Sequence, residues 1–128
     1  MSKMKFKPKH FSPKEFYCKC GKCGLGYDSM EEGILKLIDK IREEFGGPIY
    51  ITSSIRCRDY NKAVGGATKS YHMFGMACDL SPINTTEEKY KKLESITNKL
   101  NPKGGVGYYP QYGFVHCDIR GKRGRWSG

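Results

Sequence analysis

The segment Ser70–Asp79 carries two ionisable side chains, His72 and Asp79, among residues that are otherwise small or apolar. A buried imidazole or carboxylate is costly unless it meets an opposite charge, a hydrogen-bond partner or a metal ion. The chain must therefore fold so that this segment reaches matching polar groups from elsewhere in the sequence. No other part of the sequence limits the fold as strongly.

A second pair of ionisable residues lies in the apolar run Phe114–Ile119. This run is predicted to be a strand, and side chains alternate between the two faces of a strand, so His116 and Asp118 point to the same side. The third histidine of the chain, His10, lies in a lysine-rich stretch where solvation accounts for it.

These residues allow two interpretations. Two neutral imidazoles and one carboxylate would give Zn²⁺ three protein ligands and leave a fourth position for water, which is typical of a catalytic site. Zinc in such a site lowers the pKa of water and polarises a carbonyl, so amide hydrolysis is the natural reaction. Alternatively, the same side chains form a hydrogen-bonded group in the core without a metal.

The 128-residue chain has the size of one ordinary domain. We expect a single domain over residues 1–128, with a basic N-terminal segment at 1–10 and a basic tail at 121–128. The sequence has no apolar run long enough to span a membrane and no secretory signal at its N-terminus, so we expect a soluble monomer without an export signal of its own. The net charge of +10 favours an anionic partner, which leaves nucleic acid, an acidic wall polymer or a membrane surface open.

Two amphipathic helices are predicted. The first begins at a capping box of Ser29 and Glu32, ends at Gly46-Gly47-Pro48, and carries a stripe of Ile34, Ile38, Ile41 and Phe45. The second begins at a capping box of Thr85 and Glu88, ends at Asn101-Pro102, and carries a stripe of Tyr90, Leu93, Ile96 and Leu100.

Strands are predicted between and after these helices. A buried strand begins at Ile49 and runs into a loop at Ser53-Ser54, and segments 104–110 and 112–120 form an antiparallel hairpin. The elements alternate with short connectors, and the sequence has no internal repeat. The predicted fold is a single α+β domain in which a small antiparallel sheet packs against a few helices.

Six cysteines give the chain a second candidate metal site. Cys18, Cys20 and Cys23 lie in a glycine-rich stretch, and Cys57 is a fourth candidate ligand for a structural zinc ion. A single disulfide or several reduced thiols explain the same cysteines equally well. Cys78 and Cys117 lie in apolar runs and are predicted to be small buried residues.

The string Ser70-x-His72-x-x-Gly75-x-Ala77-x-Asp79, with its flanking segments, resembles the zinc D-Ala-D-Ala carboxypeptidase and L-alanyl-D-glutamate endopeptidase family. These are peptidoglycan peptidases that share a fold group with the hedgehog signalling domain. The resemblance extends from about Phe11 to Trp126. It implies a zinc cleft in which His72, Asp79 and His116 hold one catalytic ion.

The resemblance also implies roles for residues around the metal. Arg56 matches a family arginine that faces the metal, where it would stabilise charge on the substrate or bind a peptide carboxylate; the alternative is a surface arginine. Ser70 lies beside the first ligand and is a candidate for substrate binding. The basic tail either contacts wall polymer and closes over the cleft through Trp126, or is a frayed terminus.

The sequence leaves two roles open for the residue that would replace the usual general base. Many family members carry an acidic residue three positions before the last zinc histidine, and Gly113 occupies that position here. Asp118 is the replacement that we expect, because it shares a face with His116. The alternative is that Asp118 only orients the histidine or binds Arg120.

Taken together, the sequence predicts a zinc peptidase that acts on peptidoglycan and does not bind nucleic acid or insert into a membrane. The resemblance suggests a phage endolysin or a lysin carried on a virion, made in the host cytoplasm and released by lysis machinery. Two alternatives stay open. One is a non-catalytic member of the family that binds the wall, and the other is a basic nucleic-acid module stabilised by cysteine-bound zinc.

Overall fold

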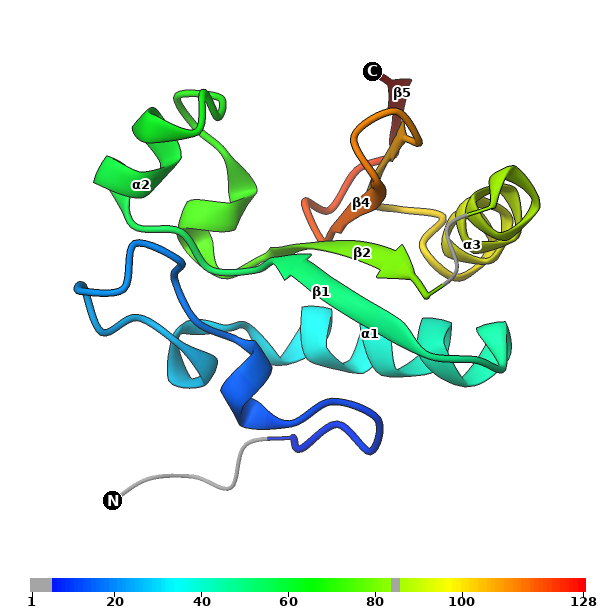
Figure 1. Ribbon diagram of the computed structural model, residues 1–128, viewed down its shortest axis with the longest axis horizontal. Coiled ribbons are helices and arrows are strands. Elements are labelled where there is room, and N and C mark those ends of the chain that lie inside the picture. Colours follow the sequence, from blue (N-terminus) through cyan, green and yellow to red (C-terminus); the bar gives the residue numbers. More distant parts are fainter. Residues whose placement is uncertain (1–5, 84–85) are drawn as a thin grey trace.

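A computed structural model of the protein describes residues 6–83 and 86–128. Five strands form one sheet in the order β1-β2-β4-β3-β5, in which only the β3–β5 pair is parallel. The strands are β1 (Ile49–Ser53), β2 (Ala77–Pro82), β3 (Gly105–Tyr109), β4 (Phe114–Asp118) and β5 (Gly124–Ser127). The predicted α+β fold with a small, mostly antiparallel sheet is confirmed (Figure 1).

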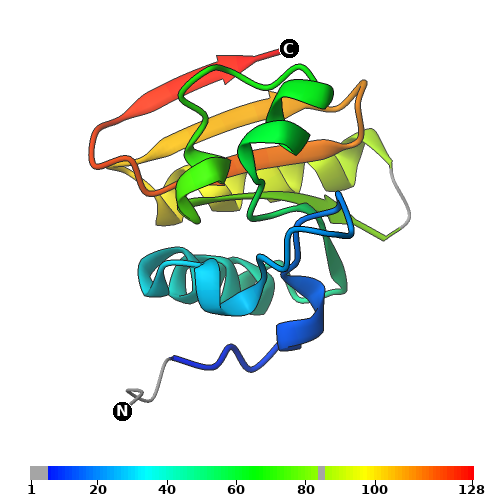
Figure 2. The ribbon, with the colours of Figure 1, turned by 90° about the vertical axis from the view of Figure 1, so that its left-hand side faces the viewer.

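Helices lie on both sides of this sheet (Figure 2). The longer helices, α1 (Glu32–Phe45) and α3 (Glu87–Leu100), pack against each other, and α3 also contacts β2, β3 and β4. The opposite side carries the short helix α2 (Arg58–Ala63) and the 3₁₀ turn η3 (Tyr71–Phe74). Two further 3₁₀ turns, η1 (Pro13–Glu15) and η2 (Tyr27–Ser29), precede α1.

The alternation of side chains along the strands gives the sheet one apolar face and one polar face. Cys78 and Leu80 of β2, and Val115 and Cys117 of β4, belong to the core together with the apolar stripes of α1 and α3. Asp79 and His116 occupy intervening positions, so they lie on the opposite face. The buried thiols of Cys78 and Cys117 therefore confirm the sequence prediction for these two residues.

Helix α1 does not begin as the sequence predicted. Its N-cap is Glu31, which makes no side-chain capping bond, and Ser29 instead ends η2, where its Oγ accepts a hydrogen bond from the backbone N–H of Gly26. The backbone N–H of Glu31 donates to the carbonyl of Gly75 at 2.8 Å, so a tertiary contact replaces the expected capping box. The end of the helix at Gly46, in the left-handed conformation, is as predicted.

The predicted start of the second helix falls partly outside the described residues, because Thr85 is not described. The N-cap of α3 is Thr86, whose Oγ1 accepts from the backbone N–H of Lys89 at 3.2 Å. At the carboxyl end, residues 124–127 are not frayed but form β5 beside β3. None of the helices in the described ranges is long and apolar enough to cross a bilayer.

The loop before β2 depends on glycine at position 75. Gly75 has a φ of +67°, and a Cβ there would lie 2.0 Å from the carbonyl oxygen of Ser29. Gly46 has a similar φ of +76°, but a Cβ there would meet open space. Both glycines thus adopt the left-handed backbone conformation, but only at Gly75 would a side chain also clash with neighbouring backbone.

We predict that Gly75→Ala destabilises the protein by at least ~2 kcal/mol more than Gly46→Ala, because only the first substitution forces backbone apart. The cost at Gly46 is expected to be about 1–2 kcal/mol, from the left-handed conformation alone. Urea unfolding of both variants measures the difference. Equal destabilisation of the two would show that the close approach to Ser29 carries no energetic weight.

A candidate metal centre on the polar face of the sheet

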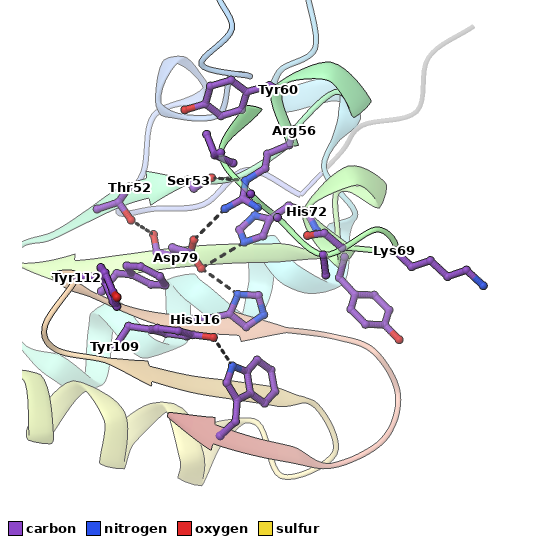
Figure 3. A pocket seen from close by; sticks show the side chains of 18 of the residues that line it. Thr52, Ser53, Arg56, Tyr60, Lys69, His72, Asp79, Tyr109, Tyr112 and His116 are labelled. Atoms are coloured by element: carbon purple, nitrogen blue, oxygen red, sulfur yellow. Dashed lines mark hydrogen bonds and ion pairs between the residues drawn. The ribbon is translucent and has the colours of Figure 1, made fainter. Parts of the chain in front are cut away.

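The polar face of the sheet presents a row of residues that crosses all five strands. Adjacent strands pair Ser53 with Asp79, Asp79 with His116, His116 with Gly107, and Gly107 with Trp126. Because residues that pair across neighbouring strands lie about 5 Å apart, side chains distant in sequence meet here. Figure 3 shows three members of this row, with Asp79 between Ser53 and His116.

His72 reaches Asp79 from the η3 turn rather than from the sheet. The turn is capped at its start by Ser70, whose Oγ accepts from the backbone N–H of His72, and it ends at Gly75. The Nδ1 of His72 lies 2.7 Å from the carbonyl oxygen of Ser54, which can only accept, so Nδ1 carries the proton. The other ring nitrogen, Nε2, faces Oδ1 of Asp79 at 3.3 Å, where it can donate a hydrogen bond when it carries a proton or offer a lone pair to a metal when it does not.

His116 is oriented in a comparable way by a carboxylate. Its Nε2 lies 2.7 Å from Oδ2 of Asp118, and its Nδ1 lies 2.9 Å from Oδ1 of Asp79. Burial lowers the pKa of His116, but hydrogen bonds to the two carboxylates and their negative charges outweigh burial and raise the pKa to about 9. In the absence of a metal, this imidazole is therefore held as a cation.

Asp79 is 3% exposed and stays ionised in spite of its burial. Burial alone would raise its pKa, but the nearby imidazoles of His72 and His116, by charge and by hydrogen bonds, lower the pKa of this carboxyl well below its usual range. The site is thus a buried anion that requires positive charge beside it.

These three side chains fit a zinc ion. One ligand atom from each of His72, Asp79 and His116 lies within 4.8 Å of the other two. In their neutral forms, the outer hydrogen bonds to Ser54 and Asp118 leave one unprotonated ring nitrogen of each histidine facing Asp79. Two nitrogen lone pairs and a carboxylate repel one another unless a cation lies between them, and this set of donors with fixed outer partners is typical of zinc sites.

Arg56 lies beside the Asp79 carboxylate. Its Nη2 is 3.5 Å from Oδ2 of Asp79, while Nε and Nη1 each donate at 3.1 Å, to Ser53 Oγ and to Asn61 Oδ1 respectively. The guanidinium lines the cavity next to Asp79. Its position is fixed by three side chains, which excludes a freely solvated surface arginine.

The placement of Asp118 favours an orienting role over the base role. The carboxylate is fully buried, and it accepts hydrogen bonds from the backbone N–H groups of Gly105 and Arg120, from two nitrogens of the Arg120 guanidinium, and from His116. Burial raises its pKa, but Arg120 and His116 lower the pKa well below the usual range. Asp118 lies behind the His116 ring and does not line the cavity.

An open cavity lies over the candidate metal site. Among the described residues that line it, Asp79 is the only carboxylate. One wall of the cavity is aromatic and consists of Tyr109, Tyr112, Phe114 and Trp126. The loop that leads to His72 also lines the cavity, with Lys69, Ser70 and Tyr71. Figure 3 shows Tyr109, Tyr112 and Lys69 around the site.

Trp126 closes one side of the cavity from β5. Its Nε1 donates to the hydroxyl of Tyr109 at 2.6 Å, and its ring lies 5.4 Å from the ring of His116. The ring fits because Gly107 lies beneath it: a Cβ at Gly107 would be 2.5 Å from Trp126 Nε1. The structure thus places Trp126 at the cavity.

Sequence reasoning missed several residues that build this site. The Ser54 group that binds His72 is a backbone carbonyl, which every residue has, so the residue type does not indicate it. Asn61, which binds Arg56, lies in a polar segment without a recognisable motif. Gly107 could have been found, because strand alternation in the predicted hairpin places it on the same face as His116 and a missing side chain there implies a close neighbour.

We predict that Asp118→Asn weakens Zn²⁺ binding at the histidine site about 10- to 100-fold, since an amide cannot hold His116 as a carboxylate does. Competition with a chelator, in protein that keeps its fold by circular dichroism, measures the affinity. Asp39→Asn is the matched control, because Asp39 is also buried and accepts two backbone N–H groups, but far from this site in α1. Equal affinities in both variants would contradict the orienting role.

Comparison with known proteins agrees with this geometry. The chain is 35% identical over 80 residues to a protein of Haemophilus influenzae named probable peptidoglycan L,D-endopeptidase MepK. The match covers 62% of this chain and 40% of that relative, so the chain spans less than half of the relative's length. The Peptidase M15 family matches residues 9–118, which include the His–Asp–His cluster and Arg56. The resemblance drawn from the sequence is therefore confirmed, and the chain belongs to the Peptidase M15 family.

Proposed function

We propose that this protein is a zinc-dependent peptidase that hydrolyses peptide bonds in peptidoglycan stem peptides or cross-links. The observation that carries the proposal is the convergence of His72, Asp79 and His116 at the floor of an open cavity, beside a fixed arginine. Membership of a peptidase family and the name of the Haemophilus influenzae relative support the reaction and the substrate.

In such a reaction, some residues would hold the metal ion and others would orient those ligands. Zn²⁺, when held by His72, Asp79 and His116, supplies Lewis-acid chemistry that polarises an amide carbonyl and lowers the pKa of water toward about 7. Asp118 and the Ser54 carbonyl fix the ring orientations, so the ligand nitrogens are aimed before any substrate arrives.

Arg56 is placed to stabilise negative charge on the substrate. Hydrogen bonds to Ser53 and Asn61 hold its guanidinium at the cavity, so little reorganisation is needed when charge develops on a carbonyl oxygen. A guanidinium in this position also suits a peptide carboxylate, which it can bind through two parallel hydrogen bonds.

The walls of the cavity suit an extended peptide. Tyr109, Phe114 and Trp126 form a wall of aromatic rings, and the Tyr109 and Phe114 rings stack at 4.7 Å. Ser70 and Lys69 line the cavity from the loop before η3, where Lys69 adds positive charge. We propose Ser70 and Trp126 as contacts for the substrate.

The setting of the reaction is also a proposal. A net charge of +10 suits an anionic cell-wall polymer, and we propose that the protein acts on bacterial walls as a lysin of phage type, as a monomer. The positive charge draws the protein toward its substrate and makes wall binding sensitive to salt.

A second candidate function is wall binding without catalysis. Gly113 carries no side chain at the position where related peptidases have an acidic base, and Asp79 is the only carboxylate among the described residues that line the cavity. A protein of this kind would bind purified walls and release no new amino groups.

We predict that His116→Ala lowers the release of amino groups from purified walls by at least ~1,000-fold, because it removes a ligand of the catalytic ion. A chelator should have the same effect on the unmodified protein, and added Zn²⁺ should reverse it. His10→Ala is the control, since His10 lies on the surface near Glu43 of α1. Wall binding without amino-group release by the unmodified protein would favour the second candidate function.

We predict that Arg56→Ala lowers kcat about 100- to 1,000-fold while zinc content stays unchanged, because the guanidinium stabilises charge that develops during reaction. The exposed neighbour Arg58, which does not line the cavity, provides the control variant Arg58→Ala. Steady-state kinetics on a defined muropeptide, followed by mass spectrometry of the products, gives kcat, KM and the bond cut. An effect confined to KM would assign Arg56 to substrate binding alone.

A further inference from the structure

Four cysteines that the peptidase chemistry does not use lie together on the side of the molecule that carries α2. The Sγ atoms of Cys18, Cys20, Cys23 and Cys57 all lie within 4.8 Å of one another. Three come from one loop, and the fourth comes from the residue that precedes α2, 34 positions beyond Cys23 along the chain. Such convergence of sulfur atoms from distant segments requires an explanation.

The loop that carries the first three cysteines is folded tightly around their side chains. Tyr17 pairs with Gly26 in an antiparallel bridge, and the backbone N–H of Cys18 donates to the carbonyl of Leu25 at 3.0 Å. Gly21 and Gly24, which directly follow Cys20 and Cys23, have φ angles of +76° and +79°. These two turns bring the cysteine side chains to the same side of the loop.

Each of the four sulfur atoms accepts a hydrogen bond from a backbone N–H. The donors to Cys20 and Cys23 are Lys22 and Leu25, each at 3.4 Å. The donor to Cys18 is Cys57, at 3.3 Å, and the donor to Cys57 is Tyr60, at 3.4 Å. Backbone donors aimed at sulfur favour thiolates, because an ionised acceptor forms the stronger bond.

Four thiolates this close together repel one another unless a cation lies between them, so the arrangement calls for positive charge among the sulfur atoms.

We propose that Cys18, Cys20, Cys23 and Cys57 bind a structural Zn²⁺ ion, separate from the catalytic site. Four thiolates at about 2.3 Å from a tetrahedral zinc ion lie about 3.8 Å from one another, which small side-chain adjustments of this cluster provide. Four protein ligands leave no open position, so the ion stabilises the fold and takes no part in hydrolysis. Soft thiolate ligands favour Zn²⁺ over harder cations.

This ion would connect the N-terminal loop to the segment that builds the cavity. Cys57 directly follows Arg56, whose backbone N–H donates to the carbonyl of His72 at 3.1 Å. The proposed metal ties this segment to Cys18, which is itself buried in the core. The cluster therefore acts as a cross-link beside the candidate catalytic residues, and it does not depend on the proposed function.

Metal analysis of the full chain tests the proposal. We expect two zinc ions per unmodified chain, one in His116→Ala and one in the double variant Cys20→Ser/Cys23→Ser. The matched control is Cys78→Ala, which removes a thiol outside the cluster and should keep both ions. Circular dichroism identifies variants that fail to fold, and the single variant Cys23→Ser, at an exposed position, replaces the double variant if that one does.

Cobalt substitution identifies the ligands directly. Co²⁺ bound in the His116→Ala variant should show thiolate-to-cobalt charge-transfer absorption and intense visible bands of a tetrahedral site, and Cys23→Ser should weaken or lose both. A chelator should also lower the thermal midpoint of His116→Ala, because only the cysteine site still holds metal there. Disulfide bonds among these cysteines in freshly purified protein, iron in place of zinc, or unchanged cobalt spectra in the cysteine variants would each overturn the proposal.

Discussion

The Asp79 carboxylate is buried between two imidazoles and a guanidinium, and the architecture around it follows from the need to compensate its charge. An isolated anion inside a protein would take up a proton instead of staying charged. Here His72, His116 and Arg56 keep it ionised, and each is held in turn by a carbonyl, a carboxylate or an amide further out. The groups that contact Asp79 are thus fixed by hydrogen bonds to a second set of groups behind them. Such outer hydrogen bonds hold ligand side chains in one orientation, as a metal site requires.

The sheet makes this arrangement compatible with a stable core. Odd and even positions of β2 and β4 point to opposite faces, so Cys78 and Leu80 pack against the helices while Asp79 faces the cavity. A shift of one residue in the register would bury the charged side chains and expose the apolar ones, so packing and chemistry select the same register. The apolar stripes of α1 and α3 thereby position a site that they do not touch.

Much of the fold and of the candidate metal site could be predicted, because the signals are local. The apolar stripe of α1, the hairpin and the shared face of His116 and Asp118 follow from periodicity alone. The start of α1 was wrong because a contact with Gly75 replaces a side-chain cap, and β5 was missed because a parallel edge strand of four residues depends on a distant partner. The proposed ligand set needed the family resemblance, since no local pattern brings His72 and His116 together. The sequence could not decide the role of Asp118, because the Arg120 guanidinium donates two hydrogen bonds to its carboxylate only in the folded chain.

The strand order also has a consequence for how the cavity is assembled. Strand β5, which carries Trp126, lies at the edge of the sheet beside β3, whereas β2, β4 and β3 each pair with two neighbours. One strand pair therefore holds the tryptophan side of the cavity, while Asp79 and His116 lie on strands that are held from both sides.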